Sequence, residues 1–430
     1  MLENFFKLKE HGTDIKTEVI AGFSTFLTMA YIIAVNPGIL SAAGMDFGAV
    51  FVATCIAAAF GTAVMGLLAN YPVALTPGMG LNAFFTFGVV LGMGQTWEVA
   101  LGAVFWSGII FVLLSMFKIR EWIINAIPSS LKTGISVGIG LFLAIIGLQS
   151  AGVVVDNPAT LVGMGDVTSL PVILFFLGFV LITALYYRGV TGSVVIGIIT
   201  TTAIGAVFGL VEYNGIMSMP PSIAPTFMKI DIMGALNVGM LAVIFAFLFV
   251  DLFDTSGTLI AVAQKGKLLD EKGRLPRLGR ALMADSTASV FGSVLGTSTT
   301  TSYIESSAGI AAGGRTGLTA VTVAVLFLVA LFFSPLALSI PAYASASALV
   351  FVAVLMVSTI ANIDWSDLTE SAPVVVTAVM MPLSYSIAEG ISAGFVTYAA
   401  IKLLSGKKDE ISISVYVIAA LGLARYMFLI

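Results

Sequence analysis

The sequence predicts an all-α polytopic membrane protein. Of the 430 residues, 59% are hydrophobic and only 10% are charged, whereas a soluble protein has about 25% charged residues. Apolar stretches close to the length that crosses a bilayer as a helix recur along the whole chain. Two of these stretches are interrupted by proline, glycine or hydroxyl-bearing residues, at corresponding places in the two halves.

The apolar stretches predict fourteen or fifteen crossings, and the sequence leaves open whether the last stretch is an additional crossing. The first eighteen residues are polar and lack the apolar core of a signal peptide, so the first apolar stretch is interpreted as the first crossing. The predicted segments cover residues 19–38, 47–69, 72–93, 98–117, 132–150, 170–187, 190–211, 235–263, 281–295, 297–312, 317–334, 343–361, 372–388 and 389–405, followed by the stretch 411–430.

The basic residues predict a cytoplasmic N-terminus in the cytoplasmic (inner) membrane, because Lys and Arg gather in cytoplasmic loops. Six of the nineteen Lys and Arg residues lie between Lys265 and Arg280, after the eighth segment. Other basic residues flank even-numbered loops or lie near the termini: Lys118, Arg120, Lys132, Arg188, Arg315, Lys7, Lys9, Lys16, Lys402, Lys407 and Lys408.

An internal repeat relates the two halves. "GAVFVATCIAAAFGT" (Gly48–Thr62) and "GRALMADSTASVFGS" (Gly279–Ser293) share Gly, Ala, Ala, Phe and Gly at a constant offset of 231 residues. An odd number of crossings in each repeat places the halves in opposite orientations. Inverted repeats are typical of secondary transporters, whose binding sites lie at paired broken segments. A weaker echo pairs Leu101, Ala103 and Val104 with Leu318, Ala320 and Val321.

Each repeated stretch leads directly into a broken segment. "YPVALTPGMGLNAFF" contains Pro72, Pro77 and Gly80, which predict a short extended piece and then a half-helix from about Gly80. "TSTTTSY" predicts a second extended piece, followed by a half-helix from near Ile304. Extended backbone at membrane depth must be buried in protein or line a wet cavity. The alternative is that the glycines and prolines only permit close helix packing.

Acidic residues within apolar surroundings mark candidate functional positions. "FAFLFVDLFDTSGTLIAVA" contains Asp251 and Asp254, which share one helix face, and Glu305 lies in the second broken segment. A carboxylate at the membrane centre costs roughly 2.5–3.5 kcal/mol and usually faces a protein interior or water. The alternative is a structural hydrogen bond or a helix cap. Four further acidic residues lie near segment ends and are interpreted as interface residues: Glu98, Asp285, Asp364 and Glu389.

The predicted site is net acidic, because no basic residue within the membrane opposes these carboxylates. Arg315, the nearest in sequence, is interpreted as a loop residue. An anionic substrate fits such a site poorly. A neutral, planar, donor-rich molecule fits it well, because a carboxylate accepts two N–H bonds and extended backbone offers donors and acceptors. Burial favours the neutral form of a carboxyl group, so a proton could accompany the substrate.

Enzyme and pump chemistry find no support in the sequence. The single histidine, His11, lies in the polar N-terminal stretch, so histidine-based metal sites and nucleophile–histidine pairs are excluded. No GxxxxGK[ST] P-loop occurs, and the loop Lys265–Arg280 is too short for a catalytic domain. The single cysteine, Cys55, forms no intrachain disulfide. The sequence predicts no enzyme activity, no cofactor and no nucleic-acid partner.

Four motifs resemble the AzgA-like branch of the nucleobase–cation symporters, which are purine permeases related to uracil and xanthine transporters. The motifs are "TEVIAGFSTFLTMAYIIAVNP", "PGMGLNAFF", "FDTSGT" and "TSTTTSYIESSAGIAAGGRTGLTAV". The resemblance covers nearly the whole chain, and the last motif is highly specific. It implies fourteen transmembrane segments in two inverted repeats of seven, with short β-strands in segments three and ten.

The resemblance also implies a core domain and a gate domain, each assembled from both halves. After the N-terminal cytoplasmic stretch 1–18, residues 19–117 and 235–334 form the core domain. Residues 118–211 and 343–430 form the gate domain, including the C-terminal segment. Relatives with this organisation often form homodimers through the gate domain, so the resemblance implies a possible homodimer.

The resemblance further implies roles for individual residues. Asp254 and Glu305 bind the nucleobase and take part in proton coupling, and Asn82 matches a polar position important for transport. The role of Asp251 in proton coupling is left open. Thr301 and Ser302, in the hydroxyl-rich stretch before Glu305, complete the predicted substrate-binding set.

The leading hypothesis is a proton-coupled purine symporter that works by alternating access, with the nucleobase and the lipid membrane as its partners. An uncoupled channel or facilitator, and an anion exchanger on the same fold, are the alternatives. The acidic site argues against an anion exchanger. The sequence leaves open whether adenine or guanine and hypoxanthine is preferred, and whether the coupling ion is a proton or sodium.

Overall fold

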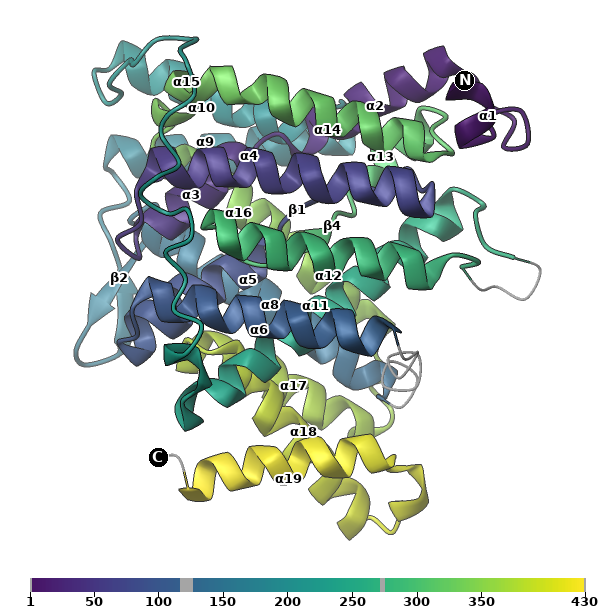
Figure 1. The fold of residues 1–430 in the computed structure, drawn as a ribbon. Coiled ribbons are helices and arrows are strands. Elements are labelled where there is room, and N and C mark those ends of the chain that lie inside the picture. Colours follow the sequence, from purple (N-terminus) through teal and green to yellow (C-terminus); the bar gives the residue numbers. More distant parts are fainter. Residues whose placement is uncertain (1, 117–126, 271–274, 429–430) are drawn as a thin grey trace.

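A computed structural model of the chain describes residues 2–116, 127–270 and 275–428. Its long helices run side by side, with α1 near one end of the molecule and two short strands in the middle of the bundle (Figure 1). Lys118 and Arg120, two of the basic residues used to predict orientation, lie outside the described residues.

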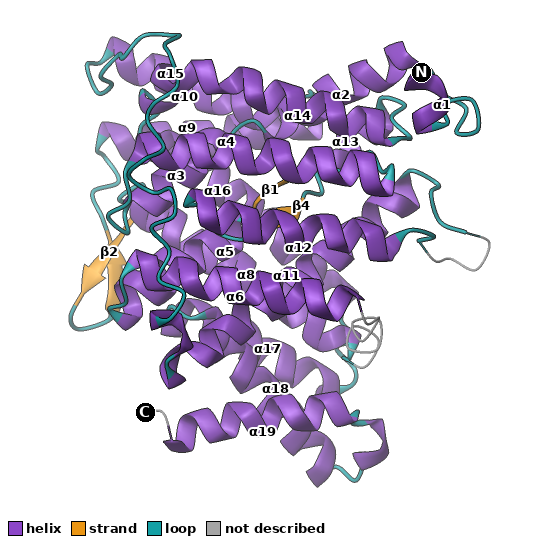
Figure 2. Cartoon of the chain, viewed as in Figure 1, coloured by secondary structure: helices purple, strands orange, loops and turns teal. Residues whose placement is uncertain are grey.

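Helices fill the first half of the chain, with two strands forming a hairpin after α8 (Figure 2). The hairpin is β2 (Val154–Asn157) with β3 (Leu161–Met164). The other elements are α1 (Leu2–Phe6), α2 (Ile15–Met29), α3 (Ile32–Ser41), α4 (Phe47–Val64), the π-helix η1 (Met65–Ala69), β1 (Leu75–Pro77), α5 (Met79–Ala83), the π-helix η2 (Phe84–Gly92), α6 (Trp97–Met116), α8 (Ser129–Ser150), α9 (Leu170–Tyr187) and α10 (Ser193–Val207).

The second half is also mostly helical, with one short strand, β4, and the long helix α11. Its elements are the 3-10 turn η3 (Gly234–Leu236), α11 (Val238–Lys265), α12 (Leu278–Leu295), β4 (Thr300–Ser302), α13 (Ser306–Ala311), α14 (Gly317–Ala330), η4 (Leu331–Phe333), α15 (Ser334–Leu338), α16 (Ala342–Val357), η5 (Ser358–Asn362), α17 (Leu368–Ser384), α18 (Ile387–Leu404), η6 (Lys408–Glu410) and α19 (Ile413–Phe428).

The helices support a multi-pass membrane protein. Among the described residues, 9 helices are long and apolar enough to cross a membrane, and three shorter apolar helices accompany them. Helical structure occurs in each predicted segment, with bounds that differ by a few residues. The count of fourteen crossings stays a prediction, because several of these helices are shorter than a bilayer requires. The same holds for an additional crossing by α19.

The first crossing is broken in its middle, which the sequence did not predict. α2 ends at Met29, and Ala30 and Tyr31 form a turn before α3 continues to Ser41. The Ala30 N–H still donates to the Phe26 carbonyl at 2.7 Å. The Tyr31 side chain, at this turn, is buried, with 3% of its surface exposed.

The two broken segments meet in an antiparallel β-ladder. β1 pairs with β4 so that Leu75 lies opposite Ser302 and Pro77 lies opposite Thr300. The Gly78 N–H also donates to the Thr299 carbonyl at 2.9 Å. Half-helices follow each strand, from Met79 and Ser306, close to the predicted starts. The ladder pairs backbone groups that would otherwise lack partners at membrane depth.

The repeated sequence stretches face each other across a local two-fold relationship. They form α4 and α12, and the rings of Phe60 and Phe291 lie 4.2 Å apart. A Cβ atom added to Gly61 would lie 2.7 Å from the Ala288 Cβ, and one added to Gly292 would lie 3.5 Å from the Ala57 Cβ. The reciprocal contact joins residues related by the offset of 231, as expected at a two-fold axis.

The helices hold the two strands in matching ways. The Thr62 hydroxyl of α4 donates to the Leu75 carbonyl at 3.0 Å and accepts from the Leu75 N–H at 2.9 Å. The Ser289 hydroxyl of α12 donates to the Thr300 carbonyl at 2.9 Å and accepts from the Thr300 N–H at 3.1 Å. Each strand is therefore attached to the helix that precedes it in its own repeat.

Helix packing separates two groups of elements. In one group, α2 and α4 pack on α14, while α11 and α12 pack on α6. In the other group, α8 packs on α16 and α17, α17 packs on α18, and α9 and α10 pack on α16. α5 and α11 of the first group also contact α8 of the second.

Candidate functional site

A cavity of about 100 Å³ lies where the two groups of helices meet, beside the β1–β4 ladder. One wall comes from the start of α5, from α11 and from the β4–α13 connection, and the opposite wall comes from α8 and α16. Its lining residues are Gly78, Met79, Gly80, Leu81, Ile139, Leu143, Val250, Asp254, Thr258, Thr301, Ser302, Tyr303, Ile304, Glu305, Val352 and Met356.

The structure brings four of the predicted site residues into this cavity. Asp254 comes from the middle of α11, and Glu305 lies immediately before α13. Thr301 and Ser302 belong to β4, and the Thr301 hydroxyl lies beside the Asp254 carboxyl group. Both carboxyl groups are partly exposed to the cavity. Among the described residues that line it, there is no Lys, Arg or His, so the site is net acidic as the sequence predicted.

Tyr31 is a site residue that the sequence reasoning missed. Tyr31 lies at the break between α2 and α3. Its hydroxyl donates a hydrogen bond of 2.7 Å to Glu305 Oε1. The Thr28 hydroxyl, from the same turn region, lies 3.4 Å from the Glu305 carbonyl. The break falls at Ala30 and Tyr31, and neither residue is a proline or glycine that would signal a helix break. No sequence signal therefore placed Tyr31 in the site.

Asn82 lies behind the cavity lining. It belongs to α5 and is fully buried, and its Oδ1 accepts a hydrogen bond from the Ser298 hydroxyl. Its neighbour Leu81 lines the cavity, whereas Asn82 does not. In this structure Asn82 therefore connects the two broken segments, and its role in substrate binding stays a prediction.

Asp251 is also behind the cavity, in a buried network with Asp285. The two carboxyl groups lie close enough to interact, and Asp285 Oδ1 accepts from the Thr255 hydroxyl at 2.9 Å. The Ser289 hydroxyl lies 3.4 Å from Asp251 Oδ2. Asp285 is 0% exposed, so its interpretation as an interface residue is wrong. α12 begins at Leu278, which places Asp285 in the second turn of a packed helix.

The network supports the strand that lines the cavity. Thr255, which donates to Asp285, accepts the Ser302 N–H at 3.3 Å. Ser289, beside Asp251, bonds to both the N–H and the carbonyl of Thr300. Thr255 and Ser289 thus link the buried carboxyl pair to β4.

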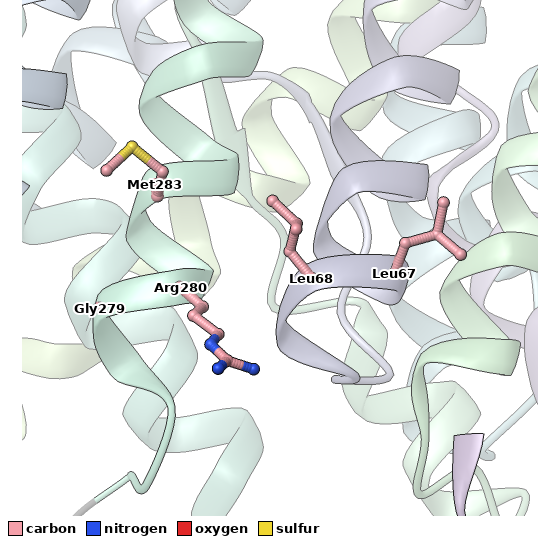
Figure 3. Close-up of a pocket in the computed structure, with 5 residues that line it drawn as sticks. All are labelled: Leu67, Leu68, Gly279, Arg280 and Met283. Carbon is pink, nitrogen blue, oxygen red and sulfur yellow. The ribbon is translucent and has the colours of Figure 1, made fainter. Parts of the chain in front are cut away.

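A larger hollow of about 510 Å³ lies at the surface, between the end of η1 and the start of α12 (Figure 3). Its lining is Leu67, Leu68, Gly279, Arg280 and Met283. It carries no carboxylate and lies away from the β-ladder, so it is not the site predicted from the sequence.

Within the described part of the chain, no group of three or more His, Cys, Asp or Glu side chains could hold a metal ion.

The broken helices, the central ladder and the acidic cavity define a multi-pass membrane permease, in which polar groups converge at paired helix breaks. The Permease family matches residues 16–393. The chain belongs to this family, which confirms the family resemblance found in the sequence.

Two relatives illustrate how closely the family matches. The chain is 53% identical to the adenine permease AdeP of Escherichia coli (strain K12), over 100% of this chain and 96% of that protein. It is 47% identical to the guanine/hypoxanthine permease PbuG of Bacillus subtilis (strain 168), over 100% of both chains. These relatives are permeases, in line with the prediction that the protein is a transporter and not an enzyme.

Solved structures share the fold at low sequence identity. The transmembrane domain of the cyanobacterial bicarbonate transporter BicA superposes with a TM-score of 0.65 at 16% identity, over 88% of this chain and 96% of that chain. This likeness shows that the chain shares the fold of that domain.

Proposed function

We propose that the protein imports purine nucleobases, adenine or guanine and hypoxanthine, by proton symport. The observation that carries the proposal is the pair of carboxyl groups, Asp254 and Glu305, in a cavity that no basic side chain lines among the described residues. A purine base is planar and presents N–H donors, which suit carboxylate acceptors. The relatives AdeP and PbuG carry purines in their names.

The remaining lining suits the faces of a flat ring. Apolar side chains approach from both groups of helices, including Ile139 and Leu143 of α8 and Met356 of α16. Thr301 and Ser302 add hydroxyl groups at the edge, next to Asp254. An apolar cavity with a few converging polar groups is typical of small-molecule sites. Asn82 is proposed to contribute to transport through the broken segments.

The proton is proposed to bind within the same acidic set. Asp254 and Glu305 face one cavity, so their negative charges repel each other. Protonation of one carboxyl group relieves this repulsion and favours binding of the substrate in the site. Asp251 joins the set through its buried partner Asp285. No cofactor is proposed besides the co-transported proton.

Alternating access is proposed to move one group of helices against the other. The core domain comprises residues 19–117 and 235–334, and the gate domain comprises 118–211 and 343–430. In this proposal Asp254 and Glu305 belong to the core side of the cavity, and α8 and α16, which also line it, belong to the gate side. A relative movement of these groups would expose the cavity to each side in turn. We propose that the protein lies in the inner membrane with a cytoplasmic N-terminus. We also propose that it forms a homodimer through the gate domain.

Uptake of radiolabelled adenine, guanine and hypoxanthine into a purine-transport-deficient bacterial host tests the proposal. We expect accumulation of at least one purine that a protonophore abolishes and that does not need sodium. Glu305→Gln and Asp254→Asn should each abolish it, while Asp156→Asn, an exposed residue of β2, leaves it unchanged.

Each other outcome contradicts a defined part of the proposal. Uptake without accumulation against a gradient would indicate a facilitator, and accumulation that requires sodium would indicate a different coupling ion. Normal uptake by both carboxyl variants, with the protein present in the membrane, would reject the assigned site.

A further inference from the structure

The surface hollow between η1 and α12 has an apolar wall and a basic rim. Leu68 and Met283 line it from the two helices, and the Arg280 side chain extends from α12 into the space between them (Figure 3). Leu67 and Leu68 are 50% and 51% exposed, in the last turn of the apolar span Phe47–Ala69. Exposed leucines on a membrane span face the acyl chains of the bilayer.

The residue before α12 contacts the segment that follows η1. The Arg277 guanidinium lies 4.9 Å from the centre of the Tyr71 ring, and the Arg277 N–H donates to the Tyr71 hydroxyl at 3.1 Å. Arg277 is therefore engaged by protein. A Cβ atom added to Gly279 would meet nothing within 4 Å, so the hollow has room at that position.

Arg280 is available to a ligand. It is exposed, and it forms no ion pair or side-chain hydrogen bond with any other residue that the structure describes. A guanidinium with unused donors favours phosphate, which it can bind through two N–H groups. Half-exposed leucines at the end of a membrane span lie beside Arg280. The phosphate group that fits both the guanidinium and these leucines is that of a phospholipid head group.

We propose that this hollow is a binding site for an anionic phospholipid. The phosphate lies on Arg280, and an acyl chain runs along Leu68 and Met283. The lipid would bridge η1, which directly follows α4, and the start of α12. The site is separate from the acidic cavity and does not depend on the proposed substrate.

Retention of phosphatidylglycerol by the purified full-length protein tests the proposal. The protein is reconstituted in vesicles of phosphatidylcholine with a minor fraction of phosphatidylglycerol, extracted into mild detergent, and analysed by native mass spectrometry. Arg280→Gln should weaken phosphatidylglycerol retention about fivefold, since one basic residue near a membrane surface contributes about 1 kcal/mol. Gly279→Leu should reduce retention while the charge is intact, because its side chain fills the hollow.

Matched variants separate this site from general effects. Arg188→Gln removes a basic residue from the end of α9, and Gly38→Leu adds a side chain to α3 where a Cβ also meets nothing within 4 Å. Both should retain phosphatidylglycerol as the parent protein does. Unchanged retention in both Arg280→Gln and Gly279→Leu would overturn the proposal. So would displacement of the lipid by millimolar glycerol phosphate, which would show a site for a small soluble anion.

Discussion

The Tyr31 hydroxyl donates a hydrogen bond of 2.7 Å to Glu305, 274 residues later in the chain. Tyr31 lies at the break in the first crossing, and Glu305 lies at the start of the half-helix in the second broken segment. A phenol can donate to a carboxylate or accept from a carboxylic acid. The pair can therefore stay bonded whether or not Glu305 carries a proton.

Tyr31→Phe should impair transport through Glu305. A hydrogen bond to a charged group contributes about 1.5–3 kcal/mol, so Vmax/KM for purine uptake should fall by about tenfold or more. Tyr187→Phe, whose ring is 91% exposed, should leave uptake unchanged.

A double-mutant cycle shows whether Tyr31 acts through Glu305. Equilibrium binding of labelled purine is measured for the parent, Tyr31→Phe, Glu305→Gln and the double variant. The loss caused by Tyr31→Phe should be much smaller in the Glu305→Gln background. Additive losses would show that the phenol contributes independently of the carboxyl group.

Asp285→Ala should destabilise the protein. The substitution leaves the Thr255 hydroxyl and the Asp251 carboxyl group without their buried partner, at a cost of about 2–5 kcal/mol. The melting temperature in detergent should fall, and Asp285→Asn should restore most of it because an amide can still bond to both groups. Asp156→Ala serves as the exposed control, and equal melting temperatures for Asp285→Ala and Asp156→Ala would contradict the prediction.

Glu18 should be essential for the start of α14. Its carboxylate accepts N–H bonds from Arg315 at 2.8 Å and from Thr316 and Thr319 at 3.2 Å, and the Thr319 hydroxyl donates at 2.6 Å. Glu18→Ala leaves these buried donors unpaired and should cost about 2–4 kcal/mol. Thermal unfolding in detergent measures the effect. Glu212→Ala, at an exposed carboxylate, should have none, and parity of the two variants would refute the role of Glu18.

Asp367 should stabilise the protein in a pH-dependent way. Hydrogen bonds from Thr369, and then the Lys407 ammonium group at 2.9 Å, hold the pKa of the Asp367 carboxyl group well below its usual value. A group whose folded pKa is lowered adds stability above its unfolded pKa, about 3.9, and this stability is lost as the pH falls toward the folded pKa.

The test compares Asp367→Ala with the parent protein over pH. The parent should have the higher melting temperature at pH 7, and the difference should shrink as the pH falls below about 4. A difference that stays constant from pH 7 to pH 3 would show that the carboxylate charge contributes nothing.

The sequence located the crossings and their interruptions because these features are local. Twenty-residue apolar stretches mark helices, and proline or a run of β-branched residues marks extended backbone. The half-helix starts at Met79 and Ser306 lie close to the predicted positions. Asp254 and Glu305 were recognised because carboxylates are costly in apolar surroundings, and the structure places both in one cavity.

Contacts between distant residues were decided only by the tertiary structure. The register of β1 on β4, the donor from Tyr31 and the burial of Asp285 each depend on groups that lie 30 or more residues apart in the sequence. Asn82 illustrates the same limit, because its position on α5 was evident, while packing turned its amide toward Ser298 rather than the cavity. Apolar periodicity fixes which residues enter the membrane, whereas the partner of each polar side chain depends on how the helices pack.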